Sequence, residues 1–257
     1  MATYKLKLAY DGTDFSGWQA QPGQRTVQGV LQEAWHEITG ETVRVTATSR
    51  TDAGVHAYGQ IVGVTTESQL VPDRLLGGLN AKLPADVVLR SVKPVYDGFH
   101  ATHDAICKRY RYRIHNGRQR PLMERRYVWH VVQNLDTQAM QLAAQHWVGK
   151  HDFASFQSTG SPRESTVRSI TAIDVVRGKR PEQIEIEVEG DGFLYNMVRN
   201  IVGTLIQVGT RKRDPAWAAE VLNAQDRCAA GQTAPAHGLV LLWVELGSET
   251  ASLNRSS

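Results

Sequence analysis

Alternation of apolar and polar residues predicts most of the secondary structure of this chain. In the first hundred residues the pattern predicts strands over residues 4–10, 42–47, 59–66 and 86–95. Two helices are expected between them. The first begins after the cap Thr26 and ends at Gly40, and the second includes Leu75, Leu76 and Leu79. The resulting β-α-β-β-α-β order is that of the split βαβ, or ferredoxin-like, arrangement.

The same pattern predicts a repeat of this order in the second half of the chain. Strands are predicted over residues 108–114, 169–177, 183–189 and 238–246. Helices are expected after Asp136, over about residues 193–208, and after Asp214 with Pro215 in the first turn. We therefore predict an α+β fold of two pseudo-symmetric ferredoxin-like halves, whose mainly antiparallel sheets join around a central cleft. The predicted division is an N-terminal subdomain over residues 1–103, a C-terminal subdomain over 104–247 and a polar tail over 248–257.

Composition favours a soluble, cytoplasmic protein without a cofactor. Of its 257 residues, 41% are hydrophobic and 21% charged, and the first residues alternate instead of forming the apolar run of a signal peptide. No run approaches the length of a membrane span, and no phosphate-binding or dinucleotide motif occurs. The residues His100, His103 and Asp104 match no strong metal-binding pattern, so no metal is predicted. Cys107 and Cys228 also lack metal-ligand spacing, and both are predicted to be reduced thiols.

Positive charge is concentrated between residues 108 and 126. This basic stripe contains one acid, Glu124, against Lys108, Arg109, Arg111, Arg113, Arg118, Arg120, Arg125 and Arg126. Tyrosines at 110, 112 and 127 are interleaved with these cations. Arginines neutralise phosphates and aromatic rings stack on bases, so the stripe favours a nucleic acid partner. The alternative is an edge strand whose charges protect against aggregation.

The segment of residues 49–57 combines a cation, a carboxylate, a glycine and an imidazole between two predicted strands. By itself Asp52 could simply stabilise a tight turn. However, Arg199 lies in the mostly apolar helix near residue 200, where burial would demand a carboxylate partner. If Asp52 is that partner, Arg199 keeps it ionised, as a nucleophile or base requires. The alternative is an ion pair that only joins two domains. With Arg50, Trp18 and Tyr110, this pair indicates a pocket for a flipped base.

Six motifs in this chain resemble the tRNA pseudouridine synthase A family. They are YDGTDFSGWQ (10–19), RTDAGVHA (50–57), FHA (99–101), RYRY (109–112), DFASF (152–156) and GFLYNMVRNIVG (192–203). They occur in the family's order over about residues 4–246.

The resemblance implies conversion of uridine to pseudouridine in the anticodon stem-loop of tRNA, at positions 38, 39 and 40. In this isomerisation the N1–C1′ bond breaks, the uracil turns while bound, and C5 is joined to C1′. No cofactor is required. The resemblance also implies the pseudouridine synthase fold, and a homodimer in which one tRNA spans both subunits.

Roles for individual residues follow from the same resemblance. Asp52 matches the catalytic aspartate, Arg199 the arginine that pairs with it, and Tyr110 the tyrosine that packs against the uracil. Arg50 matches the arginine that enters the base stack, and Leu239 is expected to line the pocket. The predicted RNA-binding residues are Lys108, Arg109, Arg111 and Arg113.

Two positions depart from the family pattern: Ser49 stands where glycine is usual, and Thr102 begins a segment that usually starts with arginine. His56 is expected to support the loop and not to act as a catalyst. One alternative function is a non-catalytic RNA-binding protein with two RRM-like halves, although no RNP1 pattern is found. Another is a glycoside hydrolase in which Glu189 or Asp191 supplies a second acid.

Overall fold

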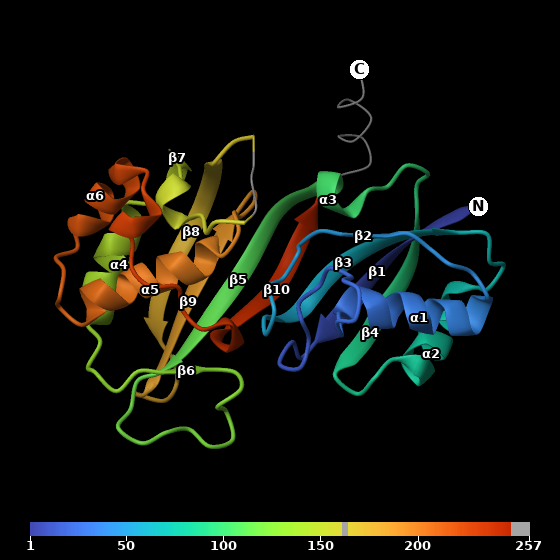
Figure 1. Cartoon of the computed structure of the whole chain (residues 1–257), viewed down its shortest axis with the longest axis horizontal. Coiled ribbons are helices and arrows are strands. Elements are labelled where there is room, and N and C mark those ends of the chain that lie inside the picture. Colours follow the sequence, from blue (N-terminus) through green and yellow to red (C-terminus); the bar gives the residue numbers. More distant parts are fainter. Residues whose placement is uncertain (161–163, 248–257) are drawn as a thin grey trace. The chain divides into compact units, whose positions relative to one another are not determined.

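The computed structural model describes residues 1–160 and 164–247 (Figure 1). The described residues form two compact units: Met1–Ile106 with residues 241–247, and Cys107–Val240. This division differs from the one predicted after residue 103. Strand β10 (Leu239–Leu246) begins in the second unit and continues in the first, because it lies beside β3 (His56–Thr66) in the strand order. The polar tail predicted over residues 248–257 lies outside the described residues.

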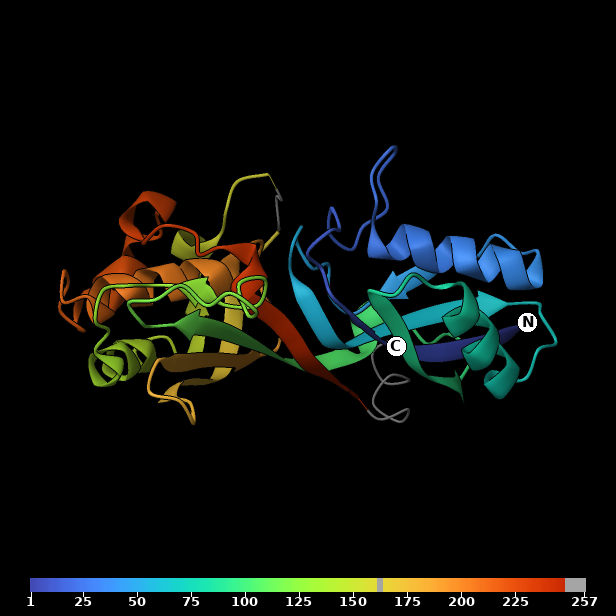
Figure 2. The same cartoon turned by 90° about the horizontal axis from the view of Figure 1, so that it is seen from below.

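The first unit has the predicted β-α-β-β-α-β order. Its elements are β1 (Ala2–Tyr10), α1 (Val27–Thr39), β2 (Val45–Ala47), β3, α2 (Pro72–Lys82), β4 (Val87–Val95) and the short helix α3 (Ala101–Asp104). Strand β1 pairs with β3 and with β4, and β2 pairs with β3, all antiparallel. Figure 2 shows α1 lying along one face of this sheet. The ferredoxin-like order of this half is therefore confirmed.

Helix α1 begins and ends where the sequence predicts. The Thr26 side chain accepts a hydrogen bond from Gly29 N at 3.2 Å, and Gly40 ends the helix with φ +76°. Helix α1 packs on α2, and the side chains of Leu31, Trp35 and Leu79 are completely buried. This packing gives the first unit a core on the α1 side of its sheet.

The second unit repeats the same strand order. Its elements are β5 (Ala105–His115), β6 (Trp129–His130), α4 (Thr137–Gln145), β7 (Gly149–Asp152), a 3₁₀ turn (Ala154–Phe156), β8 (Val167–Arg177), β9 (Gln183–Gly190), α5 (Met197–Gly209), α6 (Trp217–Ala224), and 3₁₀ turns at Arg227–Ala229 and Ala236–Gly238. β5 pairs with β9, β9 with β8 and β8 with β7, each antiparallel, whereas β6 is parallel to β5. The order β5-β9-β8 corresponds to β1-β3-β2. The α+β class and the pseudo-symmetry of the halves are confirmed.

Strand β9 shows why one face of this second sheet is apolar and the other charged. Ile184, Ile186 and Val188 are completely buried, and α5 covers their side of the sheet (Figures 1 and 2). The intervening Glu185, Glu187 and Glu189 must then point to the opposite face.

Within the described residues, no helix is long and apolar enough to cross a membrane.

Two helices begin later than predicted. Helix α5 begins at Met197 instead of near residue 193, because Asn196 adopts φ +60° and separates it from the preceding turn. Helix α6 begins at Trp217, since the carboxylate of Asp214 accepts from Ala216 N at 2.9 Å and forms a turn around Pro215. The short elements α3, β6 and β7 were not predicted.

Candidate active site

Asp52 lies in a tight turn between β2 and β3. Val55 N donates to Asp52 O at 3.1 Å, and Gly54 has φ +78°, a conformation that glycine adopts without steric strain. The side chain of Asp52 is half-buried, while that of Arg50 is exposed. The turn therefore presents one carboxylate beside one accessible cation.

The loop of residues 11–18 holds this turn through backbone contacts. Trp18 N donates to Thr51 O at 3.0 Å, and Gly54 N donates to Phe15 O at 3.3 Å. A Cβ atom on Gly12 would come 2.0 Å from Val55 O, and one on Gly17 would come 2.9 Å from Thr51 O. Only glycine allows so close an approach of two backbones. Two separate motifs of the sequence thus form one structural unit.

Trp18 packs in the core of this unit. Its side chain is 2% exposed, and its ring lies 6.3 Å from that of Tyr10. The hydroxyl of Tyr10 lies 2.7 Å from Thr51 Oγ1, so the same aromatic pair also fixes the turn. A part for Trp18 in a base pocket stays a prediction.

Gln60 on β3 fixes the start of the turn. Its buried Oε1 accepts from Thr48 Oγ1 at 2.8 Å and from Ser49 N at 3.3 Å, while its Nε2 donates to Ser49 O at 2.6 Å. Ser49 does not have a positive φ, so the side chain at this position causes no backbone strain. The departure from glycine is thus accommodated. Gln60 was not among the residues predicted from the sequence, although a glutamine within an apolar strand was the available signal.

His56 fixes the other end of the turn. His56 is 6% exposed. Its Nδ1 accepts a hydrogen bond from Gly12 N at 3.0 Å and lies 3.1 Å from Asp11 Oδ1. This position agrees with a supporting role for His56.

Arg199 lies in the first turn of α5, in the second unit. Its Nε donates to Ala234 O at 2.7 Å, its Nη1 donates to Asn196 Oδ1 at 2.7 Å, and Ala234 N donates to Arg199 O at 3.2 Å. The side chain is half-buried, although the apolar helix predicted burial. The guanidinium is therefore held in one orientation by backbone and amide groups.

A buried amide network holds the segment that carries Ala234. Asn200 is completely buried, donates to Phe156 O at 2.8 Å, and accepts from Arg227 Nη2 at 3.0 Å and Thr233 Oγ1 at 2.7 Å. The sequence analysis did not single out Asn200, although a polar residue within an apolar helix was a usable signal.

Tyr110 lies in the middle of β5, opposite Val188 of β9. Its ring is 8% exposed and meets the ring of Phe193 edge-on at 5.3 Å between centroids. Leu239, at the start of β10, is 5% exposed.

Tyr112, two residues after Tyr110 on β5, is completely buried and donates to Pro235 O at 2.8 Å, so stacking of Tyr112 on a base is excluded. Burial raises the pKa of Tyr112 strongly, and the charge of Arg199 opposes this only in part.

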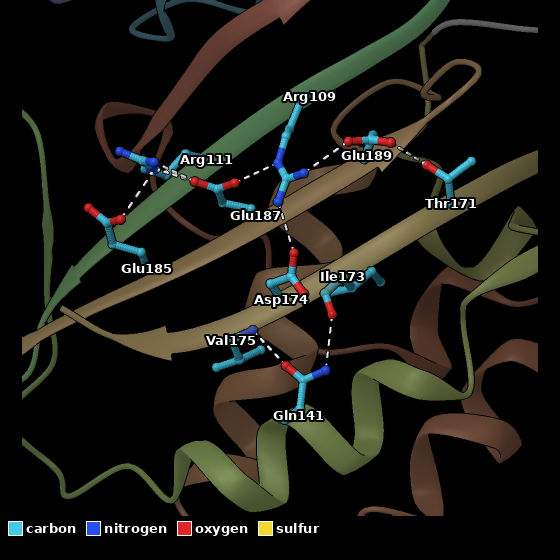
Figure 3. Close-up of polar contacts among 10 residues, drawn as sticks. All are labelled: Arg109, Arg111, Gln141, Thr171, Ile173, Asp174, Val175, Glu185, Glu187 and Glu189. Atoms are coloured by element: carbon cyan, nitrogen blue, oxygen red, sulfur yellow. Dashed lines mark hydrogen bonds and ion pairs between the residues drawn. The ribbon is translucent and has the colours of Figure 1, made fainter.

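The arginines of β5 lie opposite acids of β9 (Figure 3). The strand register places Arg109 beside Glu189, Arg111 beside Glu187 and Arg113 beside Glu185. Ion pairs result: Arg109 reaches Glu189 at 2.9 Å, Asp174 on β8 at 2.8 Å, and Glu187, while Arg111 Nε donates to Glu187 at 2.7 Å and pairs with Glu185. Burial disfavours the charge on Glu187, but both arginines outweigh it and lower the pKa of this carboxyl.

These pairs, here called the β5–β9 ladder, neutralise much of the charge that the sequence showed as a basic stripe. Three of the four predicted RNA-binding residues thus have acidic partners, and their contact with RNA stays a prediction. Neither of the explanations drawn from the sequence included pairing across the sheet.

The group of His100, His103 and Asp104, which matched no strong metal-binding pattern, has a structural role. The carboxylate of Asp104 accepts from Tyr96 OH at 2.5 Å and from His100 N at 3.0 Å, which closes the turn before β5. Within residues 1–160 and 164–247, no group of three or more His, Cys, Asp or Glu side chains is placed to hold a metal ion.

Comparison with known proteins agrees with the resemblance seen in the sequence. The family model described as tRNA pseudouridine synthase matches residues 8–104 and 143–245, which include Asp52 and Arg199. The tRNA pseudouridine synthase A of Brevibacillus brevis is 46% identical over 94% of this chain and 98% of its own length. That of Halalkalibacterium halodurans is 46% identical over 91% of this chain and 89% of its own. A solved Cbf5-Nop10-Gar1 complex is 12% identical over 79% of this chain and 54% of that chain, with a TM-score of 0.36, too low to support an argument. The chain belongs to the tRNA pseudouridine synthase family.

Proposed function

We propose that this protein converts uridine to pseudouridine at positions 38, 39 and 40 in the anticodon stem-loop of tRNA, with Asp52 as the catalytic residue. The observation that carries the proposal is the fixed turn of Asp52. Backbone contacts to residues 15–18 and the amide of Gln60 hold the backbone that carries this half-buried side chain. A pre-organised carboxylate reduces the entropic cost of reaching the reactive geometry. Two relatives that match nearly the whole chain carry the name tRNA pseudouridine synthase A.

The proposed reaction balances without water or a redox partner. The N1–C1′ bond of the target uridine breaks, the uracil turns, and a C5–C1′ bond forms. The proton on C5 leaves the base, and N1 finishes with a proton, so substrate and product are isomers. Asp52 begins bond cleavage, and attack on C1′, addition to the base and removal of the C2′ proton each require an ionised carboxylate at this place.

Four other residues complete the proposed site. Arg50 is exposed next to Asp52, which suits a cation that enters the RNA stack when the target base flips out. Arg199 is proposed as the charge partner of Asp52; its orientation by Ala234 supports this role. Tyr110 is proposed to pack against the uracil and Leu239 to line the pocket. We further propose that the protein acts as a homodimer, with one tRNA spanning both subunits.

The experiment that tests the proposal uses a tRNA transcript labelled with tritium at C5 of uridine. Isomerisation releases the tritium into water, and mapping of the product locates pseudouridine at positions 38–40. Free uracil would instead identify a glycoside hydrolase. Tight binding without release of tritium or uracil would favour the alternative of a non-catalytic RNA-binding protein.

A further inference from the structure

The loop between β5 and β6 exposes a second set of cations. In residues 117–127 the exposed side chains include Arg118, Arg120, Arg125 and Arg126. Leu122 and Met123, between the two arginine pairs, are 67% and 84% exposed. Figure 1 shows this loop, in green, extending away from the sheet of its own unit. The loop combines positive charge with an apolar tip.

The charge of this loop is not cancelled as it is on β5. Its single acid, Glu124, pairs with Arg180 at 2.6 Å, which adds a fifth arginine to the same surface. In the described part of the chain, no acid pairs with Arg118 or Arg120. The loop, and not the β5–β9 ladder, therefore carries the accessible positive charge of the basic stripe.

Hydrogen bonds from the histidines that flank the loop hold its first residues. His115 Nε2 lies 3.0 Å from Gln119 O, and His130 Nε2 lies 2.8 Å from Gly117 O. Near the tip, Arg125 Nη1 donates to Leu122 O at 2.8 Å and Tyr127 N donates to Glu124 O at 2.8 Å. A loop that is already ordered loses less conformational entropy when it binds a partner.

We propose that the loop of residues 117–127 binds the phosphodiester backbone of the RNA substrate. Its arginines neutralise phosphates, while Leu122 and Met123 pack against sugars or bases. The four cations of residues 117–127 are all arginines, and the planar guanidinium binds phosphate in a bidentate manner. Apolar side chains between arginines are also used to contact unstacked bases. The proposal rests on the proposed function only for the identity of the partner as RNA.

Two double variants of the full-length protein test the charge of the loop. We measure the affinity for an unmodified tRNA transcript at several KCl concentrations, for Arg118→Gln/Arg120→Gln and for the control Arg74→Gln/Arg90→Gln. The control removes two exposed arginines on α2 and β4. Each lost phosphate contact lowers the slope of log affinity against log salt by about 0.7–0.9. The loop variant is expected to lose about 1.5 in slope and roughly tenfold in affinity, and the control neither. Equal changes in both variants would overturn the proposal.

A third variant tests the apolar tip. Leu122→Ser/Met123→Ser is expected to weaken binding about threefold to tenfold with an unchanged salt slope, because no charge is removed. Wild-type affinity in this variant would contradict a contact between the tip and RNA. A change in oligomeric mass by light scattering, with RNA affinity unaltered, would assign the loop to contact with a second copy and overturn the proposal. These experiments measure RNA binding and not catalysis. A failure of the proposed isomerase activity would be seen in the tritium-release experiment instead, so the two failures can be told apart.

Discussion

Gly17 lies directly against the backbone of Asp52. A Cβ atom on Gly17 would come 3.2 Å from the carbonyl carbon of Asp52 and 3.2 Å from Ala53 N, and the φ of Gly17 is +95°. The loop of residues 11–18 is therefore the support on which the position of the proposed catalytic carboxylate depends.

Gly17→Ala is expected to displace the Asp52 turn and to lower turnover at least tenfold. Gly23→Ala is a matched control, because Gly23 also has a positive φ, +71°, but has open space around its Cβ position. Both variants place alanine in the left-handed region, which costs about 1–2 kcal/mol of stability. Steady-state kinetics on a tRNA transcript compares them at a temperature where both remain folded. Equal kcat values would show that Gly17 does not position the turn.

Gln60→Met is expected to destabilise the protein by about 2–3 kcal/mol, because Thr48 and both backbone groups of Ser49 lose their partner in a buried place. Turnover should fall as well, since Ser49 begins the turn. Urea unfolding checks the first effect. Gln69→Met, at an exposed glutamine, is the control and is expected to change stability by about 0.5 kcal/mol or less. A Gln60 variant as stable as this control would refute the role of the amide.

Both ends of α1 were predicted correctly from the sequence, whereas the start of α5 was not. Thr26 and Gly40 act within their own turns, so local chemistry alone locates both ends of α1. The start of α5 was predicted four residues too early, because the apolar pattern continues through Phe193 and Leu194. Only tertiary structure reveals that Asn196 adopts a positive φ there.

The β5–β9 ladder predicts a particular response to acid. The folded state lowers the pKa of Glu187 below its ordinary value of 4.5, so its ion pairs stabilise the protein fully above that value. This stabilisation is lost as the pH falls through the lowered pKa, because the protonated carboxyl no longer attracts Arg109 and Arg111. Glu187→Gln should therefore be less stable than wild type near pH 7, by a difference that shrinks toward about pH 3.

Unfolding free energies at both pH values measure this difference. Glu33→Gln, which removes an exposed glutamate from α1, controls for the change in net charge. A difference between wild type and Glu187→Gln that stays constant from neutral to acid pH would contradict the assigned ion pairs.

The proposed pairing of Asp52 with Arg199 is tested by a double-mutant cycle. Asp52→Asn and Arg199→Gln are each expected to abolish most turnover, and their effects on unfolding free energy should be coupled by about 1 kcal/mol or more. The physical reason is that either single change leaves one charge without its counterpart. Additive effects on stability would exclude the pair, whatever the activity of the variants.

The candidate site shows the same limit as the fold. Asp52, Gly54 and their motif were visible in the sequence because a short segment contains them. The support from Gly17 and Gln60 was not, since it depends on backbone contacts between strands and loops that lie far apart along the chain. Likewise, Arg109 looked available to RNA until the register of β5 and β9 placed Glu187 and Glu189 next to it.

The most direct test of the central claim maps pseudouridine in a tRNA transcript after incubation with wild type, Asp52→Ala or Asp97→Ala. Asp97 is an exposed aspartate of the same unit and serves as the matched control. Pseudouridine is expected at positions 38–40 with wild type and with Asp97→Ala, and none above background with Asp52→Ala. Equal product from wild type and Asp52→Ala would contradict it.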